Sequence, residues 1–263
     1  MNKPDKPILV IVIPCYNEEE VFPETARCLS EKINQLVSGQ VISPNSALVF
    51  VDDGSVDNTW GLIEKSHAEK PASLGGVKLL TNCGHQQALL CGLYSVKDYA
   101  DITVSIDADL QDDVEAIDQM VAGYAAGCDI VLGVRAAREV DSFFKRTSAR
   151  LFYRFMRFMG ADLVENHADF RLMSREALNS LFEYKGPKSF LRGIVPLLGC
   201  KTGTVYYDRK MRSAGKSKYT LRKMLKFAFT GIVSARIKHT SNEESPESHI
   251  EKILLKTVNG YSC

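Results

Sequence analysis

The sequence contains little that would anchor the chain in a membrane or export it. The uncharged run Phe227–Ala235 has only nine residues, whereas a helix that crosses a bilayer needs about 20. The N-terminal stretch MNKPDKPILVIVIP is too short for a signal peptide and turns polar at Tyr16 and Asn17. We therefore expect no membrane-spanning helix and interpret Ile8–Ile13 as a buried strand.

Two further absences argue against whole classes of function. The seven cysteines are scattered, without a Cys-x-x-Cys pair or an accompanying histidine cluster, so neither a zinc site nor a disulfide framework is indicated. No Gly-x-Gly-x-x-Gly follows the first apolar run, which disfavours nicotinamide binding. Internal repeats and low-complexity stretches are also missing, so we expect one globular domain, or one and a half.

The net charge is only +1, but the charges are segregated along the chain. Residues 101–118 carry seven acids and no base, whereas residues 209–226 carry eight bases and no acid. This segregation favours an acidic metal pocket that faces a basic rim, and it suits an anionic substrate.

Apolar strand-like runs alternate with amphipathic stretches over the first half of the chain. Such alternation predicts an α/β fold with a mostly parallel sheet, covered by helices on both faces. Ligands of such sheets bind beyond the carboxyl ends of the strands. The expected strands are Ile8–Ile13, Ala47–Val51, Val77–Thr81, Ile102–Ile106 and Asp129–Val134, with helices near 20–36, 59–69, 86–100 and 114–126.

The segment SIDADLQDD, residues Ser105–Asp113, carries the strongest chemical signal. Asp107 and Asp109 follow a strand-like run, so their side chains point to the same side and can hold Mg²⁺ or Mn²⁺ through oxygen ligands. A lone Asp-x-Asp is often a solvated turn. Here two more acidic motifs, Ile11–Glu20 and Val51–Thr59, also stand at strand ends, and together they indicate a site.

Seven motifs in order then identify a family: IPCYNEEE, VDDGSVDNT, NCGHQQALLCGL, SIDADLQDD, DIVLGVR, DFRLMSR and RSAGKSKYT. Over roughly residues 7–235 the chain resembles the GT-A, family 2 glycosyltransferases. It is most similar to the polyprenyl-phosphate sugar transferases of the dolichyl-phosphate mannose synthase and bactoprenol glucosyltransferase types. The resemblance implies a GT-A (Rossmann-like) catalytic domain over 1–225, with a nucleotide-sugar half (1–136) and an acceptor half (137–225).

The resemblance also implies roles for individual residues. Asp53 would accept an N–H of the base, whereas its neighbour Asp52 would have a structural role instead. Asp109 would bind the metal, and Gln111 would add an oxygen ligand. The first motif could instead be an ordinary strand-to-helix turn with capping acids. Arg135 could instead be an ordinary surface arginine. Lys145 and Arg146 would bind the acceptor phosphate. The implied nucleotide-sugar contacts are Pro14, Tyr16, Glu18, Val51, Asp53, Asp107, Ala108, Asp109, Arg135, Arg212 and Lys218.

Asp109 and Asp169 are the two expected catalytic residues. The metal at Asp109, Mg²⁺ or Mn²⁺, would neutralise charge on the departing nucleoside diphosphate. Asp169 in DFRLMSR corresponds to a base or an orienting group. A phosphate acceptor, whose second pKa is near ~6, is already largely dianionic at pH 7 and needs little deprotonation. His85 would reach the nucleotide, or cap its helix as an exposed histidine.

The last third of the chain departs from the resemblance. Ser142–Gly160 predicts a basic amphipathic helix that lies in a membrane interface or packs on the core. Relatives usually continue into two membrane-spanning helices. Here residues 226–263 stand in their place, and after the uncharged run the stretch from Arg236 to Cys263 is polar and contains Pro246. We expect a loose tail with one short helix near His249–Val258. Such a chain would be a truncated or frameshifted product, or a peripheral membrane protein.

The sequence thus predicts an inverting, metal-dependent glycosyltransferase that moves a hexose, from UDP-glucose or a related donor, to polyprenyl phosphate. The expected partners are a nucleotide sugar, a polyprenyl phosphate lipid and the membrane surface, with no nucleic acid. The location would be the cytoplasmic face of the membrane, or the cytoplasm. Two alternatives remain: a soluble family 2 transferase acting on a saccharide hydroxyl, and an inactive remnant that binds nucleotide sugar.

Overall fold

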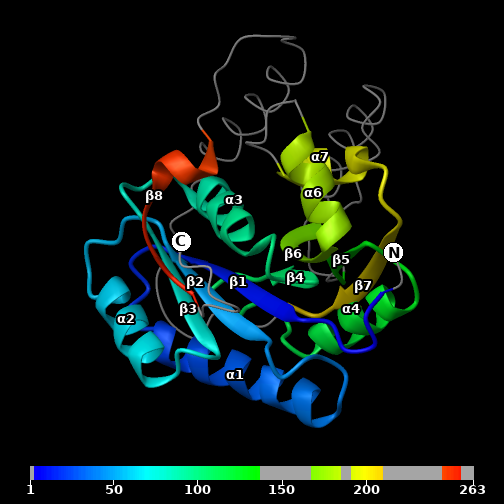
Figure 1. Cartoon of the computed structure of the whole chain (residues 1–263), viewed down its shortest axis with the longest axis horizontal. Helices are drawn as coiled ribbons and strands as arrows, with labels where there is room; N and C mark the ends of the chain where they lie inside the picture. The colour runs from blue at the N-terminus through cyan, green and yellow to red at the C-terminus, as the bar shows by residue number, and fades with distance from the viewer. Residues whose placement is uncertain (1–2, 137–166, 185–190, 210–244, 256–263) are drawn as a thin grey trace, which may run out of the picture.

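A computed structural model describes residues 3–136, 167–184, 191–209 and 245–255 (Figure 1). Its centre is one eight-stranded sheet in the order β7-β5-β6-β4-β1-β2-β3-β8. The strands are β1 (Leu9–Cys15), β2 (Ala47–Asp52), β3 (Leu74–Leu79), β4 (Ile102–Ser105), β5 (Ile130–Arg135), β6 (His167–Ser174), β7 (Thr202–Tyr207) and β8 (Ile250–Leu254).

Six of these strands run in one direction, and β6 and β8 run antiparallel to their neighbours. The predicted mostly parallel sheet is therefore confirmed. The two reversed strands are additions: β6 lies between β4 and β5, and β8 pairs with β3 at one edge.

Helices cover both faces of the sheet, as predicted (Figure 1). One face packs against α1, α2 and α4, and the other packs against α3, α6 and α7. Two 3-10 turns, η1 and η2, complete the described elements. The helical bounds are α1 (Phe22–Ser38), α2 (Thr59–Glu69), α3 (His85–Val96), α4 (Ala116–Ala125), α6 (Arg175–Glu183), α7 (Leu191–Ile194), η1 (Val195–Leu198) and η2 (Pro246–His249).

Burial on both faces explains why the sequence of the central strand β1 is apolar throughout. Leu9, Ile11 and Ile13 belong to the cluster beneath α1 and α4, whereas Val10 and Val12 pack with α3 on the other side. All five side chains are fully buried. A strand covered on both faces needs apolar residues at every position instead of alternation, which explains the uninterrupted run.

The first strand, expected to end at Ile13, continues through Pro14 to Cys15. Pairing of β1 with β2 continues through Pro14↔Val51 to Cys15↔Asp52. Pairing with β4 stops at Val12↔Ser105. Proline lacks an N–H but can remain in a strand where no ladder bond is required of it.

The short helix expected near His249–Val258 is also wrong, because Ile250–Leu254 forms β8. This strand pairs antiparallel with β3, from Gly76↔Leu254 to Leu79↔Ile250. A helix this short is marginal on its own, and the open edge of β3 offers backbone partners to an extended segment instead. The amphipathic helix expected over 142–160 lies outside the described residues.

Within the described ranges, no helix combines the length and the apolar character that a bilayer crossing requires.

Candidate active site

The acidic motifs meet at one edge of the sheet. Asp53 follows β2 and Asp107 follows β4, at the carboxyl ends of parallel strands. Asp169 stands near the start of β6, and because β6 runs antiparallel its start reaches the same edge. The register places Ser105 beside Arg171, and the Ser105 hydroxyl donates to the Asp169 carbonyl at 2.5 Å.

Asp53 is held by the loop that follows β3. Its Oδ1 accepts the Cys83 N–H at 2.7 Å, and its Oδ2 accepts the Gly84 N–H at 3.0 Å and the Asn82 side-chain amide at 3.1 Å. A carboxylate offers about four acceptor positions. Donors from the described part of the chain take three of these, which leaves room for one more donor on Oδ1.

Asp52 and Gly54 fix the loop on the other side of Asp53. Asp52 is fully buried; its Oδ1 accepts the Ser55 N–H at 3.3 Å, and burial raises the pKa of its carboxyl group. Gly54 has φ +66°, and a Cβ added there would lie 2.6 Å from the Asn82 nitrogen. Only glycine accepts both this conformation and this approach. The structure therefore packs the VDDG turn directly on the Asn82–Gly84 loop.

Three other carboxylates act electrostatically on Asp107. Burial raises the pKa of Asp107, His85 opposes that rise, and Asp112, Asp169 and Asp109 add to it. A bound cation would offset this accumulated negative charge.

The residues fit a divalent cation that is shared with substrate phosphates. Among the described residues, no three His, Cys, Asp or Glu side chains form a complete metal cage. Mg²⁺ is usually held by one or two carboxylates together with substrate phosphates and water. Asp107 and Asp109 would supply such carboxylates. The Gln111 side-chain oxygen already accepts a hydrogen bond from Arg209, and the Gln111 N–H donates to Asp109 Oδ1 at 3.2 Å.

Asp169 is the most heavily paired carboxylate of the site. Arg171 Nη2 donates to its Oδ1 at 2.6 Å, and Gln86 Nε2 donates to its Oδ2 at 3.0 Å. Arg192 contacts both oxygens, with Nε 3.2 Å from Oδ1 and Nη2 3.0 Å from Oδ2. Burial alone would raise the pKa of Asp169, but Arg192, His85 and Arg171 hold that pKa well below its usual range. Such a carboxylate is a weak base.

His85, the first residue of α3, lies between the carboxylates of Asp107 and Asp169. Its Nε2 is 3.5 Å from Asp107 Oδ1 and 3.6 Å from Asp169 Oδ2. Burial alone would lower the pKa of His85, but these two carboxylates raise it. Of the two interpretations from the sequence, the structure favours the one that places His85 in the site.

Arg135 at the end of β5 is fixed by a buried pair of acceptors. Its Nη2 donates to Asp112 Oδ1 at 3.1 Å, and its Nε lies 3.3 Å from the Tyr207 hydroxyl. That hydroxyl donates to the same Asp112 oxygen at 2.6 Å. The Arg135 side chain is 29% exposed, so it is held in place while part of it faces solvent.

The other predicted residues lie at different depths. Tyr16 is exposed and Glu18 half-buried, beside the edge where β1 ends. Pro14, Val51 and Ala108 are buried, so a ligand would meet these three mainly through their backbone; the Ala108 carbonyl already accepts the Thr25 hydroxyl at 2.6 Å. The predicted basic residues Lys145, Arg146, Arg212 and Lys218 lie outside the described residues.

Sequence reasoning missed Arg171, Arg192, Gln86 and Tyr207. Arg171 had a signal, because it stands two residues after Asp169 and strand residues two apart share a face. Gln86 follows His85 directly at the start of the same helix. Arg192 and Tyr207 come from later elements, and only the folded chain brings them to the site.

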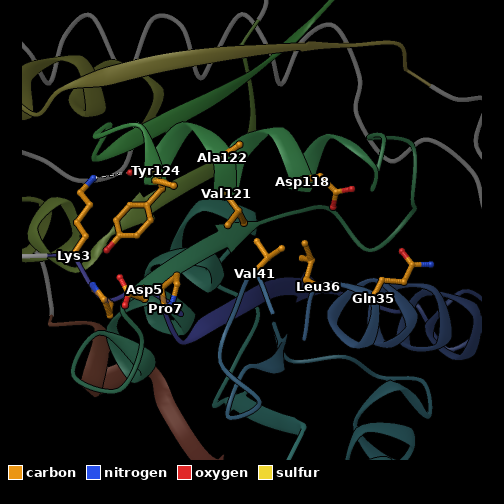
Figure 2. Close-up of a pocket in the computed structure, with 12 residues that line it drawn as sticks. Lys3, Asp5, Pro7, Gln35, Leu36, Val41, Asp118, Val121, Ala122 and Tyr124 are labelled. Atoms are coloured by element: carbon orange, nitrogen blue, oxygen red, sulfur yellow. Dashed lines mark hydrogen bonds between the residues drawn. The ribbon is translucent and has the colours of Figure 1, made fainter. Parts of the chain in front are cut away.

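A cavity of about 640 Å³ lies elsewhere, between the N-terminal segment, α1 and α4 (Figure 2). Lys3, Leu36, Val41 and Tyr124 are among its lining residues. Pro7, which also lines it, precedes β1, so the cavity opens at the edge of the sheet opposite Asp107. Its chemistry is mainly apolar, and none of the predicted site residues lines it.

Comparison with known proteins identifies the family. Residues 10–182 match the model of glycosyl transferase family 2. The chain is 51% identical over 232 residues to YkoT, an uncharacterized glycosyltransferase of Bacillus subtilis (strain 168), covering 88% of this chain and 68% of YkoT. It is 34% identical over 227 residues to a prophage bactoprenol glucosyl transferase homolog of Escherichia coli (strain K12), covering 85% and 71%.

The fold matches solved structures as well. Glucosyl-3-phosphoglycerate synthase from Mycobacterium tuberculosis, in complex with Mn²⁺, UDP-glucose and phosphoglyceric acid, superposes with a TM-score of 0.58 at 18% identity. The match covers 87% of this chain and 78% of that chain. The chain therefore belongs to glycosyl transferase family 2 and is a glycosyltransferase with the GT-A fold. The family and fold predicted from the motifs are both confirmed.

Proposed function

We propose that this glycosyltransferase moves a hexose, most simply glucose from UDP-glucose, to polyprenyl phosphate with inversion. The observation that carries the proposal is the paired state of Asp169. Arg171, Arg192 and Gln86 occupy its oxygens, and its pKa is held well below the usual range. A saccharide hydroxyl acceptor needs a strong base, whereas a phosphate acceptor is already anionic at neutral pH.

Two known proteins support the donor and the acceptor. The Escherichia coli relative is named as a bactoprenol glucosyl transferase homolog, which suggests a lipid acceptor. The Mycobacterium tuberculosis enzyme has been seen with Mn²⁺ and UDP-glucose, which suggests the donor and the metal. We extend both features to this chain as parts of the proposal.

The donor half of the site is assigned to the edge between β2, β1 and β4. Asp53 accepts an N–H of the base at its free acceptor position, and Pro14, Tyr16, Glu18, Val51 and Ala108 surround the nucleoside. Asp107 and Asp109 face the ribose and the metal, with Gln111 beside them. When bound, Mg²⁺ or Mn²⁺ supplies Lewis-acid stabilisation of the departing diphosphate. Arg135, Arg212 and Lys218 bind the phosphates.

Asp169 acts as an orienting group. Because its charge is balanced by two arginines, it fixes Arg192, whose side chain is 40% exposed, at the side where the acceptor arrives. Arg192 thus joins Lys145 and Arg146 as a candidate for the acceptor phosphate. Because the proposed acceptor is a membrane lipid, the enzyme works at the cytoplasmic face of the membrane.

The test is transfer of radiolabelled sugar from UDP- and GDP-sugars to undecaprenyl phosphate in detergent, with Mn²⁺ or with EDTA. Metal-dependent label in the lipid phase is the expected result. Label on a soluble saccharide would show that the acceptor is a saccharide hydroxyl and not the lipid. Nucleotide binding without any transfer would indicate an inactive remnant.

A further inference from the structure

The segment Pro246–Leu254 returns from the far end of the sequence to the nucleotide edge of the sheet. Figure 1 shows it in orange and red beside β3 and α3. β8 extends the sheet at β3, and the Leu80 N–H donates to the His249 carbonyl at 2.9 Å just where β3 ends. This segment therefore lies against the start of the loop that holds Asp53.

One side-chain contact connects this segment to that loop directly. His249 Nδ1 lies 3.4 Å from Cys83 Sγ. The N–H of the same Cys83 donates to Asp53 Oδ1 at 2.7 Å. A continuous path of contacts thus runs from His249 through Cys83 to the carboxylate.

Further contacts anchor the segment on both elements that flank the loop. On α3, Cys91 Sγ lies 3.4 Å from the Pro246 carbonyl and Tyr94 bonds the Glu247 carboxylate. On β3, Lys78 pairs with Glu251 at 3.0 Å. The loop is therefore framed on three sides, by β3, by α3 and by His249.

Gly75 shows that β3 is suited to receive this strand. A Cβ at Gly75 would lie 2.6 Å from the Leu254 carbonyl oxygen and 2.8 Å from a Leu255 methyl carbon. Any larger side chain at this position would push β8 off the edge. The close approach of the two backbones depends on this glycine.

We propose that His249 is a positioning residue for the nucleotide site. By holding Cys83, it keeps the Cys83 and Gly84 N–H groups on Asp53, so that the remaining acceptor position of Asp53 faces the base before the ligand arrives. The inference rests on the proposed role of Asp53. A preorganised loop improves affinity for the nucleotide without taking part in the chemical step. Its loss raises KM for the donor and leaves kcat unchanged.

The experiment measures binding of UDP and of GDP, each with MnCl₂, to the full chain by isothermal titration calorimetry. His249→Ala is expected to weaken binding by about 3- to 10-fold, the range that one lost hydrogen bond supports. Cys83→Ala breaks the same contact from the other side, together with the thiol's bond to the Thr81 carbonyl at 3.2 Å, and should cost at least as much. The double variant should bind less weakly than the sum of the two single losses predicts, because both substitutions remove the His249–Cys83 contact.

Two matched variants separate positioning from general destabilisation. Lys252→Ala removes a contact of the same strand, to Glu64 at 2.6 Å, away from the loop, and should leave nucleotide affinity unchanged. His249→Asn keeps a polar atom near the position of Nδ1 and should restore most of the affinity. Equal losses in His249→Ala and Lys252→Ala, or no loss in His249→Ala, would overturn the proposal. Cys83→Ala replaces His249→Ala if that variant does not fold.

Asp53→Asn distinguishes failure of this inference from failure of the proposed function. If Asp53→Asn weakens binding and His249→Ala does not, only the positioning role is lost. If Asp53→Asn binds like the wild type, or the wild type binds neither nucleotide, the assignment of Asp53 is wrong and the inference falls with it.

Discussion

Arg192 contacts both carboxylate oxygens of Asp169, with Nε 3.2 Å from Oδ1 and Nη2 3.0 Å from Oδ2. This two-point pair connects β6 to α7 at the site. Arg171 completes the charge balance from the same strand as Asp169. The carboxylate therefore holds cations in place, and its depressed pKa makes it a poor proton acceptor.

Arg192→Lys should lower kcat/KM for transfer by about 100-fold, the cost of a small misplacement in a reacting geometry. Lysine keeps the charge but cannot contact both oxygens in the planar arrangement of a guanidinium. Arg175→Lys is the matched control, because Arg175 pairs with Asp101 at 3.0 Å away from the predicted site residues. Steady-state kinetics with saturating donor would check this, and wild-type rates for Arg192→Lys would contradict it.

Protonated His85 should stabilise the metal-free protein, and this contribution to the free energy of unfolding should be lost as the pH rises. Asp107 at the end of β4 and Asp169 on β6 raise the pKa of His85, against burial and the charge of Arg192 on α7. The stabilisation is therefore complete below about pH 6.5, the ordinary value, and is lost as the pH rises through the higher folded-state pKa. Urea unfolding in EDTA, compared between wild type and His85→Gln, measures it. The wild-type advantage should shrink from pH 6 upward; a constant difference would contradict this explanation.

The donor edge could be predicted because its signals are local. The apolar run Ile102–Ile106 ends at Asp107, and a strand in a parallel sheet delivers its last residues to the ligand-binding edge. Asp53 follows its strand in the same way. For such residues the position depends only on the strand that precedes them, so the sequence pattern was sufficient.

The acceptor side and the C-terminal edge could not be predicted in the same way. Asp169 reaches the site only because β6 inserts antiparallel between β4 and β5, a pairing that no local pattern encodes. Arg192 arrives through a four-residue helix. Ile250–Leu254 has a sequence that suits a short helix equally well, and the open edge of β3 decides its conformation.

Asp109→Asn should lower transferase turnover by at least about 100-fold, as should EDTA, with recovery on adding Mn²⁺ only in the wild type. The physical reason is that asparagine keeps one neutral oxygen but loses the negative charge and the second oxygen of the carboxylate beside the diphosphate. Asp118→Asn is the control, because Asp118 is an exposed acid of the same segment and pairs with Lys32 instead. Full activity of Asp109→Asn would show that the metal assignment is wrong.

Gly54→Ala should destabilise the protein more than Gly199→Ala, although both glycines have nearly the same φ, +66° and +68°. Alanine in this left-handed conformation costs about 1–2 kcal/mol at either position. At Gly199 nothing lies within 4 Å of the added Cβ, whereas at Gly54 the Asn82 nitrogen would be 2.6 Å away. That backbone cannot rotate aside as a side chain would.

The difference between the two free energies of unfolding, measured in urea, should therefore be at least about 1 kcal/mol, at the low end of overpacking costs. The same change must push the Asn82–Gly84 loop away from Asp53, so UDP affinity should fall in Gly54→Ala and stay unchanged in Gly199→Ala. Equal unfolding free energies would mean that the two loops are not in rigid contact. The coupling of the VDDG turn to the loop after β3 would then have no structural basis.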